Sequence, residues 1–252
     1  MKKGFAIVLT LLFIFTMFVG CGKSNDTKTE NTNTQTSESA SGTNRKVEPT
    51  SVEAKASTLS GDSYAFTAFG KKYTLGKSTL QDFLDDGWTF DSKNTSDPSE
   101  PSFEVDAYTY ANTPNLIKNE SIIYYPRFVN FSKNNSCPLS QCKLLYYTVN
   151  FSGKNVYSSN EPVTPSGENN FELPLGINGT FCMADLMDKV ESVGLGHYEQ
   201  DYDTYYTFYA THNYDDADES YSITAAFSKD TQIIQSVTVE ISTFTNGEFD
   251  EA

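Results

Sequence analysis

Cysteine and histidine are the residues of this chain best suited to chemistry, and both are scarce: the sequence has four cysteines and two histidines. Cys137 and Cys142 are close neighbours in the chain, with Pro138 between them. In an exported protein such a pair can close a small disulfide loop. In a reduced protein both side chains would instead serve as small apolar residues. The sequence leaves both states open.

Cys182 lies in the first turn of a predicted helix, where the helix dipole would lower the pKa of its thiol. A cysteine nucleophile also needs a base, and His197 and His212 are the only histidines. The sequence contains no serine-hydrolase, zinc-peptidase or nucleotide-binding motif. We therefore predict that the protein is not an enzyme and that Cys182 is a buried helix residue.

The densest acidic cluster is formed by Asp215, Asp216, Asp218 and Glu219. Their spacing does not match the calcium loop of an EF-hand, and two histidines are too few for an ordinary zinc site. We predict a solvated turn at this cluster, with no metal site and no cofactor.

Tyrosine is unusually frequent, with 16 residues. In a predicted strand over residues 202–212, Tyr205 and Tyr209 alternate with Phe208 and therefore point to the opposite face. Tyrosine combines a large contact area with a hydrogen-bonding tip, so an open sheet face that carries such residues would suit recognition of a partner. The alternative is that these tyrosines are half-buried beneath another part of the fold.

Three further aromatic residues join this candidate surface. Tyr108 and Tyr110 take a similar place in a predicted strand over residues 103–110, and Trp88, the single tryptophan, follows the first predicted helix. The candidate binding residues are therefore Tyr205, Tyr209, Tyr108, Tyr110 and Trp88.

Two short amphipathic helices precede the predicted strands. The first runs from an N-cap at Ser78 to Gly87, and the second runs from an N-cap at Thr180 to Gly194. The apolar stripe of the second helix consists of Met183, Leu186, Met187 and Val190. Alternating patterns predict strands over 103–110, 122–131 and 143–151 after the first helix, and over 202–212, 221–227 and 233–241 after the second.

The two helix segments share one pattern, because Leu175-Gly176-Ile177-Asn178 follows Leu75-Gly76-Lys77-Ser78 at an offset of 100 residues. This arrangement resembles the β-lactamase-inhibitor-protein-like and SmpA/OmlA-like modules of bacterial envelope proteins, most clearly over residues 175–190, 202–209 and 223–241. The resemblance implies a binding or assembly module without shared catalytic residues. We expect an α+β fold of two tandem units, each with a short helix packed on an antiparallel β-sheet.

The N-terminus predicts export and anchoring. Lys2 and Lys3 precede an apolar run over residues 5–19, which is shorter than the roughly 20 residues of a membrane span. Phe18-Val19-Gly20-Cys21 resembles the bacterial lipobox, with Phe18 in place of the usual leucine. The resemblance implies cleavage before Cys21 and attachment of acyl chains such as palmitate to its thiol. Cleavage elsewhere and an uncleaved N-terminal anchor are the alternatives.

Charge and composition narrow the range of partners. Residues 22–63 lack aromatic side chains and are rich in threonine, serine and asparagine, a composition typical of a disordered tether. Loss of Lys2 and Lys3 changes the formal charge from −15 to −17. Such an acidic chain is a poor ligand for nucleic acid or anionic lipid.

The predicted organisation is a signal peptide (1–20), a lipidated cysteine with a disordered linker (21–63), a first α+β unit (64–151), an inter-unit linker (152–170) and a second α+β unit (171–246). We expect a lipoprotein on the extracytoplasmic face of a Gram-positive-type cell membrane. Its expected function is non-catalytic binding of a protein partner at the cell envelope. A solute- or glycan-binding lipoprotein is the alternative, and an envelope hydrolase is the least favoured class.

Overall fold

The structure is a computed structural model that describes residues 46–53, 59–93, 98–153, 162–202, 205–212, 220–242, 244–245 and 248–249. The predicted signal peptide, Cys21 and the acidic cluster at 215–219 lie outside these residues. Within the described ranges, no helix has both the length and the apolar character needed to cross a membrane.

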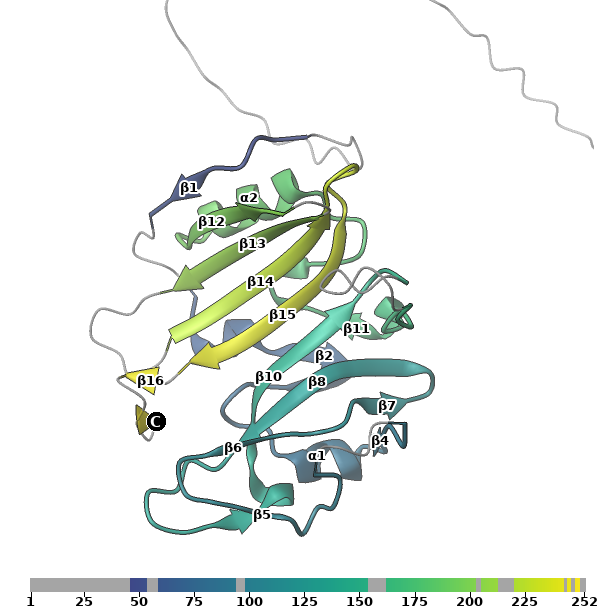
Figure 1. The fold of residues 1–252 in the computed structure, drawn as a ribbon, viewed down its shortest axis with the longest axis vertical. Helices are drawn as coiled ribbons and strands as arrows, with labels where there is room; N and C mark the ends of the chain where they lie inside the picture. The colour runs from purple at the N-terminus through teal and green to yellow at the C-terminus, as the bar shows by residue number, and fades with distance from the viewer. Residues whose placement is uncertain are drawn as a thin grey trace, which may run out of the picture. The chain divides into compact units, whose positions relative to one another are not determined.

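One antiparallel sheet of ten strands dominates the described structure (Figure 1). Its path runs β1-β12-β13-β14-β15-β10-β8-β7-β4, and β6 pairs with β8 beside this path. The strands are Ser51–Val52 (β1), Thr89–Phe90 (β4), Tyr110–Asn112 (β6), Leu116–Lys118 (β7), Ser121–Val129 (β8), Lys143–Asn150 (β10), Gly196–Asp201 (β12), Tyr205–His212 (β13), Ser220–Ser228 (β14) and Ile234–Ser242 (β15).

Smaller sheets complete the strand inventory. They consist of β2 (Phe66–Ala68), β3 (Lys71–Tyr73) and β11 (Phe171–Glu172); of β5 (Glu104–Val105) and β9 (Cys137–Pro138); and of β16 (Phe244–Thr245) and β17 (Glu248–Phe249). Short 3-10 helices lie at Gly61–Tyr64, Leu139–Gln141, Glu168–Asn170 and Pro174–Gly176.

Helix α1 (Leu80–Asp85) begins after Thr79, one residue later than predicted. The Thr79 N–H donates to the Asp82 carboxylate at 2.7 Å, and the Asp82 N–H donates to the Thr79 hydroxyl at 3.3 Å. This reciprocal pair satisfies backbone N–H groups that the first helical turn leaves without partners. The predicted cap, Ser78, instead accepts from the Thr74 N–H at 2.9 Å, so its hydroxyl belongs to the preceding turn.

Helix α2 (Met183–Ser192) begins after Cys182, whose N–H donates to the Asp185 carboxylate at 3.0 Å. The predicted cap, Thr180, lies two residues earlier and donates its N–H and hydroxyl to the Asn178 side chain. The predicted apolar stripe is confirmed: Met183, Leu186 and Val190 are fully buried, and Met187 is partly buried against the same core.

Both helices cover the same face of the main sheet and lie behind it in Figure 1. On this covered face, Phe208, Ile223 and Val239 have no exposed surface. Aromatic rings join the core beneath α1: Phe83 stacks on Tyr73 with ring centroids 4.1 Å apart. Because side chains alternate along a strand, the residues between these apolar positions point to the other face of the sheet.

The predicted α+β fold of two helix-on-sheet units is wrong. The described residues contain α-helices of six and ten residues beside a main sheet of ten strands, so the fold is β-rich. Strand β15 pairs with β10 in antiparallel register, with Val237 opposite Val149. Each of these strands would otherwise expose a row of unpaired backbone groups. The sequence left open whether the two predicted units share one sheet, and this pairing carries one sheet through the junction between them.

A turn divides the strand that was predicted over residues 103–110. Tyr108 has a φ of 57°, in the left-handed region and outside the β region of regular strands. The chain consequently leaves β5 and enters β6 in a different sheet. Strand β12 was not predicted, and it extends the expected three-stranded meander after α2 to four strands.

Residues 46–52, which belong to the predicted linker, dock on the edge of the main sheet. There β1 pairs with β12. The Gln232 side chain accepts from the Val47 N–H and donates to the Val47 carbonyl, both at 2.8 Å. The Thr50 N–H donates to the Glu199 carboxylate. We call residues 46–52 the docked arm.

A buried histidine lies beneath the docked arm. His197 Nδ1 is 2.8 Å from Glu199 Oε1, and His197 Nε2 is 3.0 Å from Glu191 Oε1. Burial opposes the positive charge, but the hydrogen bonds and charges of the two carboxylates outweigh it, so the pKa of His197 is raised above its ordinary value. The imidazole therefore links β12, α2 and, through Glu199, the arm.

This cluster predicts a specific dependence of stability on pH. A raised pKa in the folded state adds stability below the unfolded pKa of 6.5, and the contribution is lost as the pH rises through the folded value. The difference in free energy of unfolding between the wild type and His197→Gln should therefore be largest at pH 6 and smaller at pH 9. Urea denaturation at both pH values measures it, and a difference that grows with pH would contradict the assignment.

Candidate binding face

The face of the main sheet opposite the helices carries a row of threonines between tyrosines. Tyr209 of β13 lies opposite Thr224 of β14, which lies opposite Thr238 of β15, and Thr148 of β10 comes next. The Thr148 and Thr238 hydroxyls are 2.7 Å apart, so they form a hydrogen bond with each other. We call Thr224, Thr238 and Thr148 the threonine row. Its short side chains lie low, with Thr148 7% and Thr238 8% exposed.

Four tyrosines lie at the β12–β13 end of this row. Tyr198 stacks on Tyr209, and Tyr202 stacks on Tyr205, each with ring centroids 4.7 Å apart and planes inclined by 15°. Gln200 joins the two stacks by accepting from the Tyr202 hydroxyl at 2.6 Å and from the Tyr209 hydroxyl at 3.3 Å. We call Tyr198, Tyr202, Tyr205 and Tyr209 the tyrosine patch.

The tyrosine patch is partly exposed and uncharged. Tyr198 is 43% and Tyr202 is 40% exposed. Burial raises the pKa of Tyr205 and of Tyr209, so these phenols remain protonated at neutral pH and keep their ability to donate hydrogen bonds. The patch therefore offers apolar ring surface together with hydroxyl groups, as tyrosines in protein interfaces do.

Arg127 lies on the same face, beyond the threonine row. We call this residue and the four that it contacts, Tyr110, Tyr146, Asn112 and Glu240, the arginine cluster. The Arg127 guanidinium lies 4.5 Å from the ring centroid of Tyr146 and 5.5 Å from that of Tyr110. Its Nε donates to Asn112 Oδ1 at 3.0 Å, and its Nη1 is 3.9 Å from Glu240 Oε1. Burial raises the pKa of Glu240, and the positive charge of Arg127 only partly opposes this effect. These contacts hold the guanidinium in one orientation.

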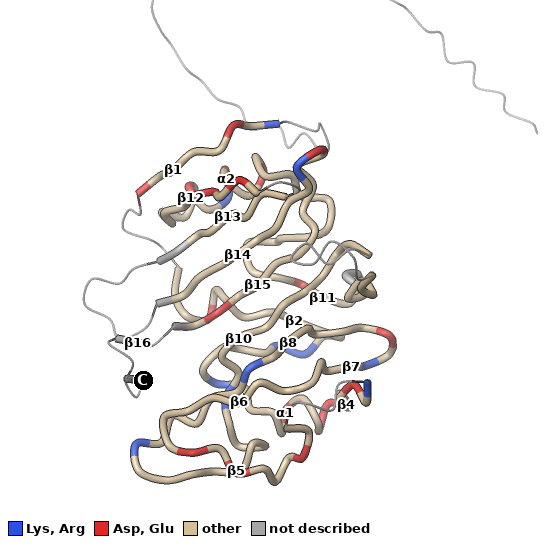
Figure 2. Tube along the Cα trace, in the orientation of Figure 1, with Lys and Arg blue, Asp and Glu red and all other residues tan. Residues whose placement is uncertain are grey.

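Few charges lie between the tyrosine patch and the arginine cluster. Strands β13 and β14 carry no lysine, arginine, aspartate or glutamate, and Glu240 is the single such residue of β15. Figure 2 shows β13 and β14 in tan over the parts that it describes. On a chain with a formal charge of −15, a face with so little charge is distinctive.

The predicted binding residues fall into different surroundings. Tyr205 and Tyr209 belong to the tyrosine patch, and Tyr110, 43% exposed, belongs to the arginine cluster. Tyr108 is half-buried against the hydrophobic core. Trp88 is a core residue, 1% exposed, and its Nε1–H donates to the Tyr73 hydroxyl at 3.1 Å. The structure thus brings two of the five together and removes Trp88 from the surface.

Sequence reasoning missed Tyr198, Tyr202 and Arg127. Simple alternation from residue 202 to residue 208 would place Tyr202 on the covered face with Phe208. Strand β12, however, ends at Asp201, which breaks this alternation and allows Tyr202 to stack on Tyr205. The sequence of β12, Gly-His-Tyr-Glu-Gln-Asp, has no apolar–polar alternation, so no periodic signal pointed to Tyr198.

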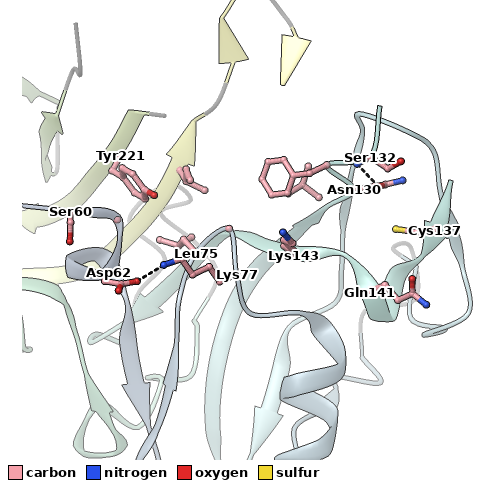
Figure 3. Close-up of a pocket in the computed structure, with 15 residues that line it drawn as sticks. Ser60, Asp62, Leu75, Lys77, Asn130, Ser132, Cys137, Gln141, Lys143 and Tyr221 are labelled. Atoms are coloured by element: carbon pink, nitrogen blue, oxygen red, sulfur yellow. Dashed lines mark hydrogen bonds and ion pairs between the residues drawn. The ribbon is translucent and has the colours of Figure 1, made fainter. Parts of the chain in front are cut away.

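A cleft of about 760 Å³ lies at the end of the sheet near the first residue of β10 (Figure 3). Buried Leu75, Val129, Tyr221 and Ile241 contribute apolar surface to it. At its rim the Lys77 ammonium binds the Asp62 carboxylate at 2.8 Å.

Among the described side chains no thiol is hydrogen-bonded to His197, and the side chain of His212 lies outside them. Burial raises the pKa of Cys182, the opposite of the effect that a nucleophile requires and that the helix dipole suggested. His197 uses both ring nitrogens for carboxylates. Cys137 and Cys142 are free thiols, with their Sγ atoms 3.5 Å apart. Within the described ranges, no group of three potential metal-ligating side chains is present.

No protein-family model, no curated protein and no solved structure matches the chain. The resemblance to envelope modules therefore rests on the sequence pattern alone.

Trp88 is buried and Tyr110 is exposed, so replacing each with alanine should lower the free energy of unfolding by different amounts. Trp88→Ala leaves a large cavity in an aromatic core and should lower the free energy of unfolding by about 3–5 kcal/mol. Tyr110→Ala removes an exposed ring and one cation–π contact, and should cost about 1 kcal/mol or less. Urea denaturation of the two variants checks this order, and equal losses would contradict the assignment of Trp88 to the core.

Proposed function

We propose that the protein is a membrane-anchored extracytoplasmic lipoprotein whose folded part binds a protein partner without catalysis. The binding surface is the open sheet face, from the tyrosine patch across the threonine row to the arginine cluster. The observation that carries this proposal is the pairing of a half-exposed aromatic patch with uncharged strands on an acidic chain. Aromatic residues and arginine, with few other charges, are typical of the centres of protein interfaces.

The arrangement of the rings favours a protein over a glycan. Sugars bind by stacking on free aromatic ring faces, whereas in both stacks of the tyrosine patch one ring covers a face of the other. Each ring therefore offers a ligand at most one face, together with its edge and its hydroxyl, which suits a broad contact with backbone groups and apolar side chains. The expected partner presents an uncharged surface.

The cleft supports a second candidate function, the binding of a solute or a glycan fragment. Its volume of about 760 Å³ lies within the usual range of small-molecule sites, and an apolar floor with a few polar groups is typical of them. Loss of partner binding through the tyrosine patch, with the cleft intact, separates the two candidates.

Tyr205→Ala combined with Tyr209→Ala tests the binding face. Crosslinking on intact cells should capture a partner with the wild-type protein, and the purified partner should bind the double variant at least about tenfold more weakly, a loss of about 1.4 kcal/mol or more.

Phe103→Ala is the matched control for this experiment. Phe103 is 46% exposed and lies beside β5, outside the main sheet, so its removal should leave the affinity unchanged. Unchanged capture by the double variant, or equal losses in both variants, would refute the sheet-face proposal.

The anchor has its own test. We expect Cys21→Ser to abolish labelling by a fatty-acid probe such as azido-palmitate, because the serine hydroxyl cannot replace the thiol that lipobox processing acylates. The variant should be released from the membrane or accumulate as a longer precursor, as immunoblotting of cell fractions would show. Labelling that persists in Cys21→Ser would overturn the lipoprotein assignment.

A further inference from the structure

Cys137 and Cys142 place two thiols in contact at the wall of the cleft. Their Sγ atoms are 3.5 Å apart. Cys137 belongs to β9, where it pairs with Val105 of β5, and Cys142 follows the 3-10 helix Leu139–Gln141. Cys137 lines the cleft, and Figure 3 shows its sulfur beside Gln141 on the cleft wall.

The backbone around the two thiols is fixed by hydrogen bonds. The Leu139 N–H donates to the Phe103 carbonyl at 2.7 Å, and the Cys142 N–H donates to the Leu139 carbonyl at 3.1 Å. A disulfide bond of about 2.05 Å requires the sulfurs to approach by roughly 1.5 Å, a distance within reach of side-chain rotation. The same backbone can therefore hold the reduced pair and the oxidised pair.

The two thiols differ in access, and burial lowers the acidity of the Cys142 thiol. Cys142 is 1% exposed, and burial, reinforced by the hydrogen bond to Cys137, raises the pKa of its thiol. Cys137 is half-buried and open to the cleft. Because a thiolate must reach the sulfur that it attacks, Cys137 is the residue that an external reagent meets first, and Cys142 reacts only with a sulfur already attached to Cys137.

We propose that Cys137 and Cys142 form a thiol–disulfide exchange site that takes disulfides of low molecular weight through the cleft. The Cys137 thiolate attacks one sulfur of the external disulfide, which forms a mixed disulfide and releases one thiolate. The Cys142 thiol then loses its proton and attacks the Cys137 sulfur, which forms the internal disulfide and releases the second thiolate. Two protein thiols are oxidised, and one external disulfide is reduced to two thiols.

The position of the pair connects this exchange to the cleft and to α1. The Cys142 carbonyl accepts the N–H of Leu80, the first residue of α1, at 3.1 Å, and the next residue, Lys143, lines the cleft. A loop closed across so few residues adds less stability through chain entropy than a long loop would. The internal disulfide therefore acts on the local shape of the cleft wall more than on the fold as a whole.

Oxidised glutathione is a suitable probe for this site. The full-length reduced protein is incubated with it, free thiols are alkylated, and peptides are mapped by mass spectrometry. The wild type should gain a Cys137–Cys142 disulfide. Cys142→Ser should trap glutathione on Cys137 at least about tenfold faster than Cys137→Ser traps it on Cys142. Cys142→Ala repeats the measurement without a buried hydroxyl.

Cys182 is the internal control. It is 2% exposed and should neither pair nor take up glutathione while the protein is folded. Circular dichroism before and after oxidation establishes that each variant keeps its fold. Failure of the folded wild type to form the internal disulfide, or equal rates of glutathione uptake at Cys137 and Cys142 in the two serine variants, would overturn the proposal.

Discussion

The antiparallel pairing of β10 with β15 is the interaction on which the rest of the structure depends. It places Val149 opposite Val237 on the covered face and Thr148 opposite Thr238 on the open face. The first pair joins the apolar surfaces beneath the two helices into one core, and the second pair completes the threonine row. A shift of one residue would exchange the two faces, so a single register determines both the core and the candidate binding face.

The side chains of the open face are held in place by contacts with one another. Its centre is made of short hydroxyl side chains that bond to one another, and its ends carry aromatic rings held by stacking, by Gln200 and by the Arg127 cation. Because these groups are already oriented, a partner that binds there orders few side chains on this protein. The low charge of β13 and β14 also spares the partner the cost of removing water from ions.

Periodic sequence patterns predicted those features that depend on residues close together in the chain. The stripe of α2 and the opposite faces of β13 follow from periodicity, and there the sequence was a sufficient guide. The pairing of β10 with β15 joins segments about 90 residues apart in the chain, and no periodic pattern specifies such a register. The site shows the same division: Tyr209 was predicted from alternation, whereas Tyr202 depends on a turn, and Trp88 depends on the tertiary contact with Tyr73 that buries it.

On an anchored chain the docked arm would also govern how mechanical load enters the fold. Tension from the membrane side meets the Val47–Gln232 pair first, then the Thr50–Glu199 contact, and then β1. These attachments lie in series along the chain, so they can yield one at a time before the other nine strands of the main sheet are pulled apart. Release of the docked arm (residues 46–52) would lengthen the tether by up to about 23–25 Å. On an anchored chain the docked arm would therefore detach from the sheet before the force reaches the candidate binding face.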